Sequence, residues 1–273
     1  MITILHIAEI ILYIILAFNT GYLLLFAIAS KFCRPRIYPR TAPGTKFAVL
    51  FPAYKEDKVI IPAISFLQQD YPRELYDIIV ISDQMQESTN EALRQLPVRL
   101  LIADYTDSSK AKAMSLAMNA TADIPYDAVV IMDADNTAGT SFLSELNPVF
   151  QSGARAVQAH RTAKNTNTDI AVLDAASEEI NNSIFRSGHI ALGLSSALIG
   201  SGMALEACWF RQHIHLLETA GEDKEMEALL LKQRIHIEYL EHVYVKDEKT
   251  QKKEGIKNQR KRWIAAQFDS LVR

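Results

Sequence analysis

The chain opens with an almost unbroken run of apolar residues. Between Ile10 and Ala29 no residue is charged, and only one Asn and one Thr are clearly polar. About 20 consecutive apolar residues allow a helix to cross the hydrocarbon core of a bilayer. No basic residue precedes the run, unlike in a secretory signal peptide, whereas Lys31, Arg34, Arg36 and Arg40 follow it. We therefore expect residues 1–30 to form a transmembrane anchor, with the rest of the chain in the cytoplasm.

A short linker separates this run from the remainder of the chain. Residues 31–45 contain three prolines and three arginines and show no periodicity. From Lys46 onward, short apolar runs typical of buried strands alternate with segments of helical periodicity. We expect strands at 47–51, 76–82, 98–103 and 128–132, and helices at 59–67, 87–96 and 109–120, the last capped by Ser108 or Ser109. This alternation predicts an α/β fold in which a mostly parallel sheet carries helices on both faces.

The second half of the chain is less regular. We expect strands at 154–160 and 236–240, helices at 169–186, 205–217 and 222–232, and a loop rich in Gly, Ser and Leu at 190–203. The α/β domain is thus predicted to span residues 46–245. Residues 246–262 then hold eight basic and three acidic residues, and an apolar stripe follows. We expect residues 246–273 to form a basic amphipathic segment at a membrane interface.

Composition narrows the class of protein. The 273 residues, 49% of them hydrophobic, suffice for one sizeable α/β domain and a small additional element. The formal net charge of −3 gives no indication that nucleic acid is a partner. Cys33 and Cys208 lie far apart and match no metal-ligand spacing, so we interpret them as free thiols in a reducing compartment.

Two carboxylates stand at the predicted end of an apolar strand, in Asp133-Ala134-Asp135. Ligands of parallel α/β sheets bind at the carboxyl ends of the strands. If the chain turns there, both side chains reach one divalent cation, and Mg²⁺ or Mn²⁺ prefers oxygen ligands and bridges to substrate phosphates. Taken alone, the same motif is more often a solvated turn than a metal site.

Further blocks follow in a fixed order around this motif. They are Phe51-Pro52-Ala53-Tyr54-Lys55-Glu56, Ile81-Ser82-Asp83, Gly221-Glu222-Asp223 and Gln259-Arg260-Lys261-Arg262-Trp263. With them the chain resembles glycosyltransferase family 2, and within it the membrane polysaccharide synthases of the cellulose, hyaluronan and poly-N-acetylglucosamine type. The resemblance extends over residues 46–265. The Gln-x-x-Arg-Trp block combined with an upstream Glu-Asp and Asp-x-Asp is a specific signature.

The resemblance implies a GT-A type fold and inverting transfer from a nucleotide-sugar, with a UDP-sugar expected, to a polysaccharide or glycolipid acceptor. It implies that Asp133 and Asp135 bind Mg²⁺ or Mn²⁺ and that Asp223 is the general base. The residues that it assigns to the nucleotide-sugar are Pro52, Ala53, Tyr54, Glu56, Asp83, Lys110, Lys112, Asp133, Gln259 and Arg262. Those that it assigns to the acceptor are Gly200, Ser201, Gly202, Glu222 and Trp263.

Elementary chemistry is consistent with these roles. Inverting transfer needs one base to take the proton of an acceptor hydroxyl, because a diphosphate leaving group is stabilised by cations rather than by a proton donor. Arg262 offers a planar donor fork for phosphate oxygens, and Trp263 a flat apolar face for a sugar ring. The alternatives are an acid stabilised by a helix N-terminus for Asp223 and a basic–aromatic membrane anchor for Arg262 and Trp263.

The sequence also departs from the pattern that it resembles. Lys55 stands where family members commonly have Asn, and Gln84 where they often have Asp. The sequence as given has no further transmembrane helix, so we expect either a missing membrane region, a partner subunit that supplies it, or a simpler single-span enzyme. These departures keep open a second hypothesis, a weakly active or inactive homologue that serves as a subunit of a polysaccharide-synthesis complex. A nucleotidyltransferase is disfavoured, because the Pro52-Ala53-Tyr54 segment is not the Gly-rich basic loop usual in that class.

Overall fold

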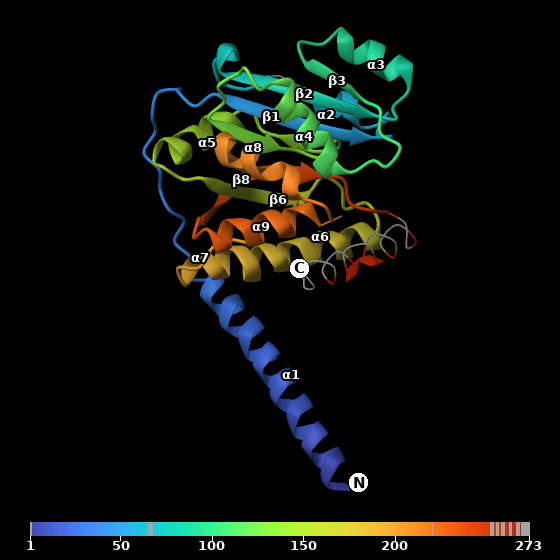
Figure 1. Cartoon of the computed structure of the whole chain (residues 1–273). Helices are drawn as coiled ribbons and strands as arrows, with labels where there is room; N and C mark the ends of the chain where they lie inside the picture. The colour runs from blue at the N-terminus through green and yellow to red at the C-terminus, as the bar shows by residue number, and fades with distance from the viewer. Residues whose placement is uncertain are drawn as a thin grey trace.

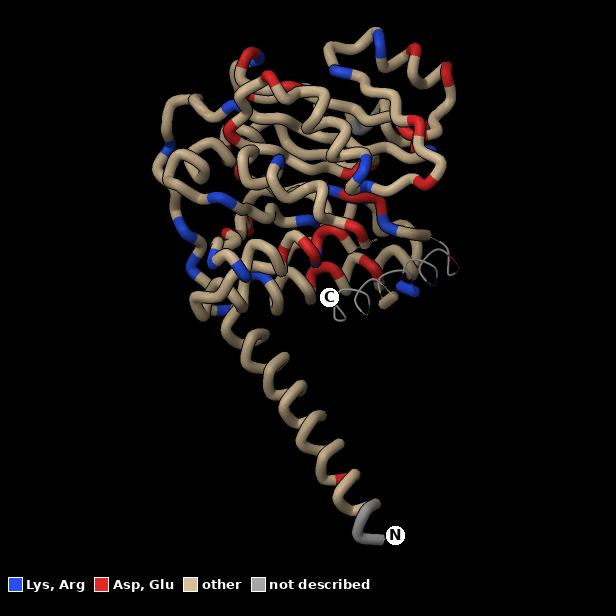
Figure 2. The backbone as a smooth tube through the Cα atoms, viewed as in Figure 1, with Lys and Arg blue, Asp and Glu red and all other residues tan. Residues whose placement is uncertain are grey.

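A single long helix projects from an α/β domain (Figure 1). The computed structural model describes residues 2–64, 68–219 and 221–251, together with 254, 257, 260, 261, 264, 265 and 268. The long helix, α1, spans Ile2–Ser30. Its segment Leu5–Ser30 is long and apolar enough to cross a membrane by length and composition. Along α1 the one charged residue is Glu9, as Figure 2 also shows.

An eight-stranded sheet forms the centre of the domain. Its strands lie in the order β3-β2-β1-β4-β7-β6-β8-β5. The pairs β1/β2, β1/β4, β2/β3 and β6/β8 are parallel, whereas β7 and β5 run antiparallel to their neighbours. The bounds are β1 Phe47–Tyr54, β2 Tyr76–Asp83, β3 Arg99–Ala103, β4 Ala128–Ile131, β5 Thr137–Ala138, β6 Ala156–Ala163, β7 Met203–Glu206 and β8 Ile237–Asp247.

Helices cover both faces of the sheet, because the strands are apolar on both faces. Along β1, Phe47 and Phe51 pack toward α2 and α5, whereas Ala48 and Leu50 pack toward α4, α8 and α9. The helices are α2 Ile60–Ala63, α3 Glu87–Arg94, α4 Lys110–Ala120, α5 Phe142–Gln151, α6 Asp169–Asn181, α7 His189–Ala191, α8 Ala207–His213 and α9 Glu222–Lys232. Two 3₁₀ turns, η2 Arg73–Leu75 and η4 Ile214–Leu216, and a π-helical segment, η3 Asn182–Gly188, complete the elements.

The predicted α/β class with a mostly parallel sheet is confirmed, but several element bounds were wrong. Leu205 lies in strand β7 and not in a helix, because an antiparallel strand buried on both faces has no helical or alternating pattern of its own. Strand β8 continues to Asp247, beyond the expected end at Leu240. Helix α2 ends at Ala63, and residues 65–67 lie outside the described residues. The basic amphipathic segment predicted for residues 246–273 also lies largely outside them.

The last turns of α1 pack against the domain. The Tyr22 hydroxyl hydrogen bonds to Nε2 of His189 at 2.7 Å, and the Phe26 ring lies 4.6 Å from the His189 ring, centroid to centroid. Nearer the end of the helix, Ser30 Oγ lies 2.8 Å from Ser183 Oγ. These contacts join α1 to η3 and α7, so the end of the apolar helix and the domain form one packed unit.

Gly188 permits the close approach of η3 to α1, because a Cβ at this position would lie 2.4 Å from the backbone oxygen of Phe26. We therefore expect Gly188→Ala to lower the free energy of unfolding by about 1–3 kcal/mol, the usual cost of overpacking. The measurement is thermal and urea unfolding of the full chain in detergent. Gly139→Ala is the matched control, since its Cβ would meet no atom within 4 Å. Equal effects of the two substitutions would contradict the close-packing account.

Candidate active site

Most of the predicted site residues meet at one edge of the sheet. The parallel strands β1, β2, β4, β6 and β8 all end at this edge, and the antiparallel strand β7 begins there. The segments that follow these strand ends, or precede β7, therefore converge, although they are distant in sequence. They carry Glu56, Asp83, the Asp133–Asp135 turn, the Gly200–Gly202 loop and Asp247.

Lys110 connects the Asp133–Asp135 turn, the Gly200–Gly202 loop and the start of α9. It begins α4, which is capped by Ser109, whose Oγ accepts a hydrogen bond from the backbone N of Lys112. The Lys110 ammonium lies 2.5 Å from Asp133 Oδ1 and 2.8 Å from the carbonyl oxygen of Gly200. It also lies 3.6 Å from Glu222 Oε1 at the start of α9. Although burial alone would lower the pKa of Lys110, Asp133 and Glu222 raise it above its usual value.

The turn Asp133–Asn136 fixes the orientation of both aspartates. Asn136 is fully buried, and its side chain accepts a hydrogen bond from the Asp133 backbone N and donates one to Asp135 Oδ1. Desolvation works to raise the pKa of Asp133, but Lys110 and Arg161 hold it below its usual value. Asp135 lacks such a cation, and burial together with the Asp133 charge raises its pKa. The pKa of Glu56 is raised in the same way, by partial desolvation and by the charges of Asp135 and Asp133.

The donor set fits a divalent cation shared with a substrate. Among the described residues no three carboxylate, imidazole or thiol groups converge closely enough to hold a metal by themselves. Mg²⁺ and Mn²⁺, however, are usually held by one or two carboxylates and completed by phosphate oxygens and water. Burial first, and then the charges of neighbouring carboxylates, raise the pKa values of Asp135 and Glu56, and a cation would offset that negative charge.

The loop before β7 is held against the site by buried hydrogen bonds. Gln158 on β6 accepts from the backbone N of Ile199 and donates to the carbonyl oxygens of Ser201 and Gly202. From α9, Lys224 donates to the Leu198 carbonyl oxygen. Gly200 and Gly202 adopt φ values of +80° and +62°, which side chains other than glycine rarely adopt. The loop is therefore rigid at the point where Lys110 binds it.

Asp223 lies directly behind this loop. A Cβ built on Gly200 would stand 3.8 Å from Asp223 Oδ2, so the carboxylate packs against the loop that Lys110 contacts. Its other oxygen, Oδ1, accepts a hydrogen bond from the Lys224 backbone N. Glu222 is buried beside it, and burial raises the pKa of Glu222 although Lys110 opposes the shift. The fold thus places the Glu222-Asp223 pair near the aspartate turn, with Lys110 between Glu222 and Asp133.

The segments after β1 and β2 form the adjoining part of the site. Asp83 is buried and accepts a hydrogen bond from Ser108 Oγ, and its carbonyl oxygen accepts one from the Lys55 backbone N. Lys55 and Gln84 both have left-handed φ values, of 55° and 54°. Asn and Asp tolerate this conformation better than long side chains do. Lys55 and Gln84 therefore replace the usual Asn and Asp at two positions where the left-handed backbone favours Asn and Asp.

Some predicted residues are not brought into the cluster. Lys112 turns away from Lys110, and its ammonium binds the Asp107 carbonyl oxygen at 2.6 Å. Ala53 is buried in the core, and Pro52 is part of the ladder with β2, so the exposed Tyr54 and Glu56 present the side chains of this segment at the edge. Gln259, Arg262 and Trp263 lie outside the described residues.

A buried ion network, which the sequence pattern did not predict, supports the site. Arg161 on β6 lies 4.0 Å from Asp133 Oδ2, 2.9 Å from Glu178 on α6 and 3.6 Å from Asp247 at the end of β8. Lys249 binds Glu178 and Asp247 at 3.3 and 2.9 Å. Arg161, Glu178 and Lys249 are all buried. The charge of Arg161 next to the predicted strand 154–160 was the available signal, but its partners Glu178 and Asp247 lie 17 and 86 positions further along the chain.

Glu178 is the shared anion of this network. Burial works to raise its pKa, but Arg161, Lys249 and Arg186 keep it below the usual value. We expect Glu178→Gln to remove the anion that these buried cations share, leaving Asp247 and Asp133 to offset them only in part, and to cost about 3–5 kcal/mol in unfolding free energy. Glu179→Gln is the matched control, because the neighbouring side chain is half exposed and makes hydrogen bonds to His160 and Thr162. Denaturant unfolding would check both, and similar losses would contradict the network account.

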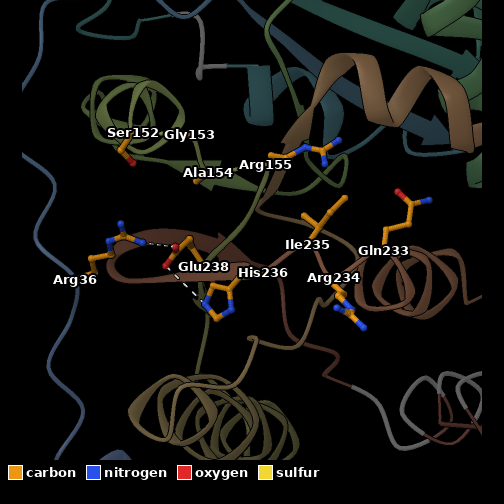
Figure 3. Close-up of a pocket in the computed structure, with 10 residues that line it drawn as sticks. All are labelled: Arg36, Ser152, Gly153, Ala154, Arg155, Gln233, Arg234, Ile235, His236 and Glu238. Carbon is orange, nitrogen blue, oxygen red and sulfur yellow. Dashed lines mark hydrogen bonds and ion pairs between the residues drawn. The ribbon is translucent and has the colours of Figure 1, made fainter.

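A cavity of about 250 Å³ lies elsewhere, at the opposite edge of the sheet (Figure 3). It is lined at the starts of β6 and β8 by Arg155 and His236, with Arg36 from the linker and Arg234 after α9. Arg36 binds Glu238 at 2.8 Å. None of the predicted site residues lines this cavity.

The comparisons with known proteins agree with this geometry. The profile of the glycosyltransferase-like family 2 matches residues 43–266, so the chain belongs to this family. A search of curated protein sequences gives no match. Among solved structures, the mannosyltransferase PcManGT from Pyrobaculum calidifontis, in complex with GDP-Man and Mn²⁺, superposes with a TM-score of 0.66 at 17% identity, over 97% of this chain and 75% of that one.

A second structural relative is TarS of S. aureus. Its segment 1–349 in complex with UDP-GlcNAc gives a TM-score of 0.50 at 12% identity, over 76% of this chain and 60% of that one. The same segment without a named ligand gives a TM-score of 0.51 at 14% identity, over 73% of this chain. At these identities the likeness establishes the GT-A fold. The family predicted from the sequence is thus confirmed.

Proposed function

We propose that this protein is a metal-dependent inverting glycosyltransferase that moves a sugar from a nucleotide-sugar to a glycan or lipid-linked acceptor at the cytoplasmic face of a membrane. The observation that carries the proposal is the convergence of Asp133, Asp135, Lys110 and Asp223 at one sheet edge of a family 2 glycosyltransferase. The named ligands of the structural relatives, GDP-Man with Mn²⁺ and UDP-GlcNAc, support a nucleotide-sugar donor.

The donor would lie along the ends of β1, β2 and β4. Asp83, rigidly held by Ser108, faces the nucleoside side, where Tyr54 offers an exposed ring. Asp133 and Asp135 face the diphosphate side, and Mg²⁺ or Mn²⁺ held by them would neutralise charge on the departing nucleoside diphosphate. Arg262 and Gln259 are proposed to bind the same diphosphate.

Proton transfer falls to Asp223 in this proposal. Its Oδ2 accepts no hydrogen bond from the described residues and lies beside the Gly200 loop, so it is available to take the proton of an acceptor hydroxyl as that oxygen attacks the anomeric carbon. The Lys110 ammonium stands between Asp133 and Glu222 and so balances the negative charge shared by the two halves of the site. Gly200–Gly202, Glu222 and Trp263 are proposed to position the acceptor.

The apolar helix α1 supports the membrane location. Its side chains from Leu5 to Gly21 are all exposed, and four basic residues follow within the linker. An acceptor at the membrane surface would keep both substrates close to the site. A polysaccharide acceptor would make the protein an enzyme of the synthase type that the sequence resembles. A lipid-linked sugar as acceptor would make it a simpler transferase.

The donor and metal requirements are tested with the full chain in nanodiscs. We expect radiolabelled transfer from one member of a panel of UDP- and GDP-sugars, dependent on Mn²⁺ or Mg²⁺ and abolished by a chelator. In calorimetry with UDP or GDP, Asp135→Asn should weaken metal-dependent binding by at least about 10-fold, the loss that even outer-shell changes cause. Asp107→Asn, a solvent-exposed control, should have no effect. Absence of metal-dependent binding of either nucleotide by the unaltered protein would favour the role of an inactive complex subunit.

The assignment of the base is tested by Asp223→Asn. We expect kcat to fall about 10²–10⁴-fold, because an amide cannot accept the proton. Binding of the nucleotide with metal should stay within a factor of about 2, since the carboxylate does not face the diphosphate side in our proposal. Asp123→Asn, on an exposed turn at the opposite edge of the sheet, is the matched control. Full activity of Asp223→Asn would exclude this residue as the base.

A further inference from the structure

Helix α6 buries one of its acidic residues and exposes large apolar ones. Glu178 is buried in the ion network, whereas Leu173 and Ile180 are 67% and 57% exposed. Of the other acidic residues of α6, Asp169 and Glu179 are exposed and Asp174 is half-buried. Leu173, Ala176 and Ile180 are spaced at i, i+3 and i+7, so they lie along one outward face of the helix, and Ala176 is exposed as well. Helices at an aqueous surface show the opposite arrangement, with apolar residues inward.

The apolar surface continues beyond α6. The chain passes without interruption from α6 through η3 to α7, and the following turn exposes Leu192 and Leu194 to 47% and 48%. In Figure 1, α6 and α7 lie on the side of the domain from which α1 leaves. We call the five residues Leu173, Ala176, Ile180, Leu192 and Leu194 the outer apolar face.

The length of the exposed part of α1 indicates where the outer apolar face lies relative to the bilayer. From Leu5 to Gly21 every side chain is exposed, and these 17 residues span roughly 26 Å at about 1.5 Å per residue. That length approaches the roughly 30 Å of a bilayer hydrocarbon core. Beginning with Tyr22, α1 packs on His189 and Ser183 of α7 and η3. If the exposed part is in the bilayer, the packed part and the elements that it contacts lie at the membrane surface.

We propose that α6 is an interfacial helix, whose outer apolar face rests in the headgroup region of the bilayer that α1 spans. The occupant of this face is thus lipid, because the face is continuous with the exit of α1 and is fixed to it by the contacts of Tyr22, Phe26 and Ser30. The inference rests on the proposed membrane anchoring. It adds that the domain sits directly on the bilayer and that Glu178, on the inner face of α6, ties this lipid-facing helix to Arg161 and the site.

The test uses the full chain in phosphatidylcholine nanodiscs, with Cys33→Ser and Cys208→Ser removing the native thiols. Single cysteines introduced by Leu173→Cys, Ile180→Cys and Leu194→Cys carry an environment-sensitive fluorophore. Leu16→Cys reports insertion of α1, and Glu91→Cys, exposed on α3 at the far end of the domain, is the matched aqueous control. Quenching is measured with nitroxide-labelled lipid and separately with aqueous iodide.

We expect labels at 173, 180 and 194 to show blue-shifted emission and lipid quenching several-fold stronger than at 91, with weaker iodide quenching. The inference would be overturned if iodide quenched the labels at 173, 180 and 194 as strongly as the label at 91. Lipid quenching at 16 in the same samples would show that the anchor is still inserted. Labels at these positions shielded from both quenchers would also overturn it, since protein would then cover the face. No lipid quenching at 16 would instead refute the anchoring, and lipid quenching at 173 and 180 in that case would support a peripheral attachment through α6.

Discussion

The arrangement of the site depends on the ammonium group of Lys110. It lies within 3.6 Å of oxygens from three separate segments, the Asp133 turn, the Gly200 loop and the start of α9. Without a cation here, Asp133 and Glu222 would face each other as two partly desolvated carboxylates, an arrangement that disfavours ionisation of both. Lys110 allows Asp133 to remain charged, whereas burial and neighbouring carboxylates raise the pKa values of Asp135 and Glu56.

A second charged group connects the site to the periphery of the domain. Arg161 extends from β6 toward Asp133 on one side and toward Glu178 and Asp247 on the other. Glu178 faces inward to meet it, and Leu173, Ala176 and Ile180 lie on the outward side of the same helix. The ionic network thus supports the aspartate turn and also holds α6 beside the end of α1. Burial of such a network is costly unless all partners are present, which couples these regions energetically.

The local pattern of apolar and polar residues was sufficient to predict the strands of the first half of the domain. Strands β1, β2 and β4 are short, mostly apolar runs, and each ends close to a polar residue of the site, so both the fold class and the edge that carries Asp83 and Asp133 were predictable. The cap of α4 was predicted at Ser108 or Ser109, and it is Ser109. The helix predicted from Glu222 matches α9. The pattern failed at β7, because four residues between a glycine loop and a helix, three of them buried, do not reveal a period.

The sequence by itself therefore determined the long apolar helix, the α/β class and the glycosyltransferase family, and it named most of the residues that the fold brings together in the candidate site. Only the tertiary structure decided that Lys110 and not Lys112 enters the cluster, that Arg161 supports it, and that α6 turns its apolar face outward. The physical reason is that periodicity and motifs act over a few neighbouring residues. Charge pairing within the candidate site joins residues as distant in sequence as Lys110 and Glu222, 112 positions apart, and is fixed only when the strands pack side by side.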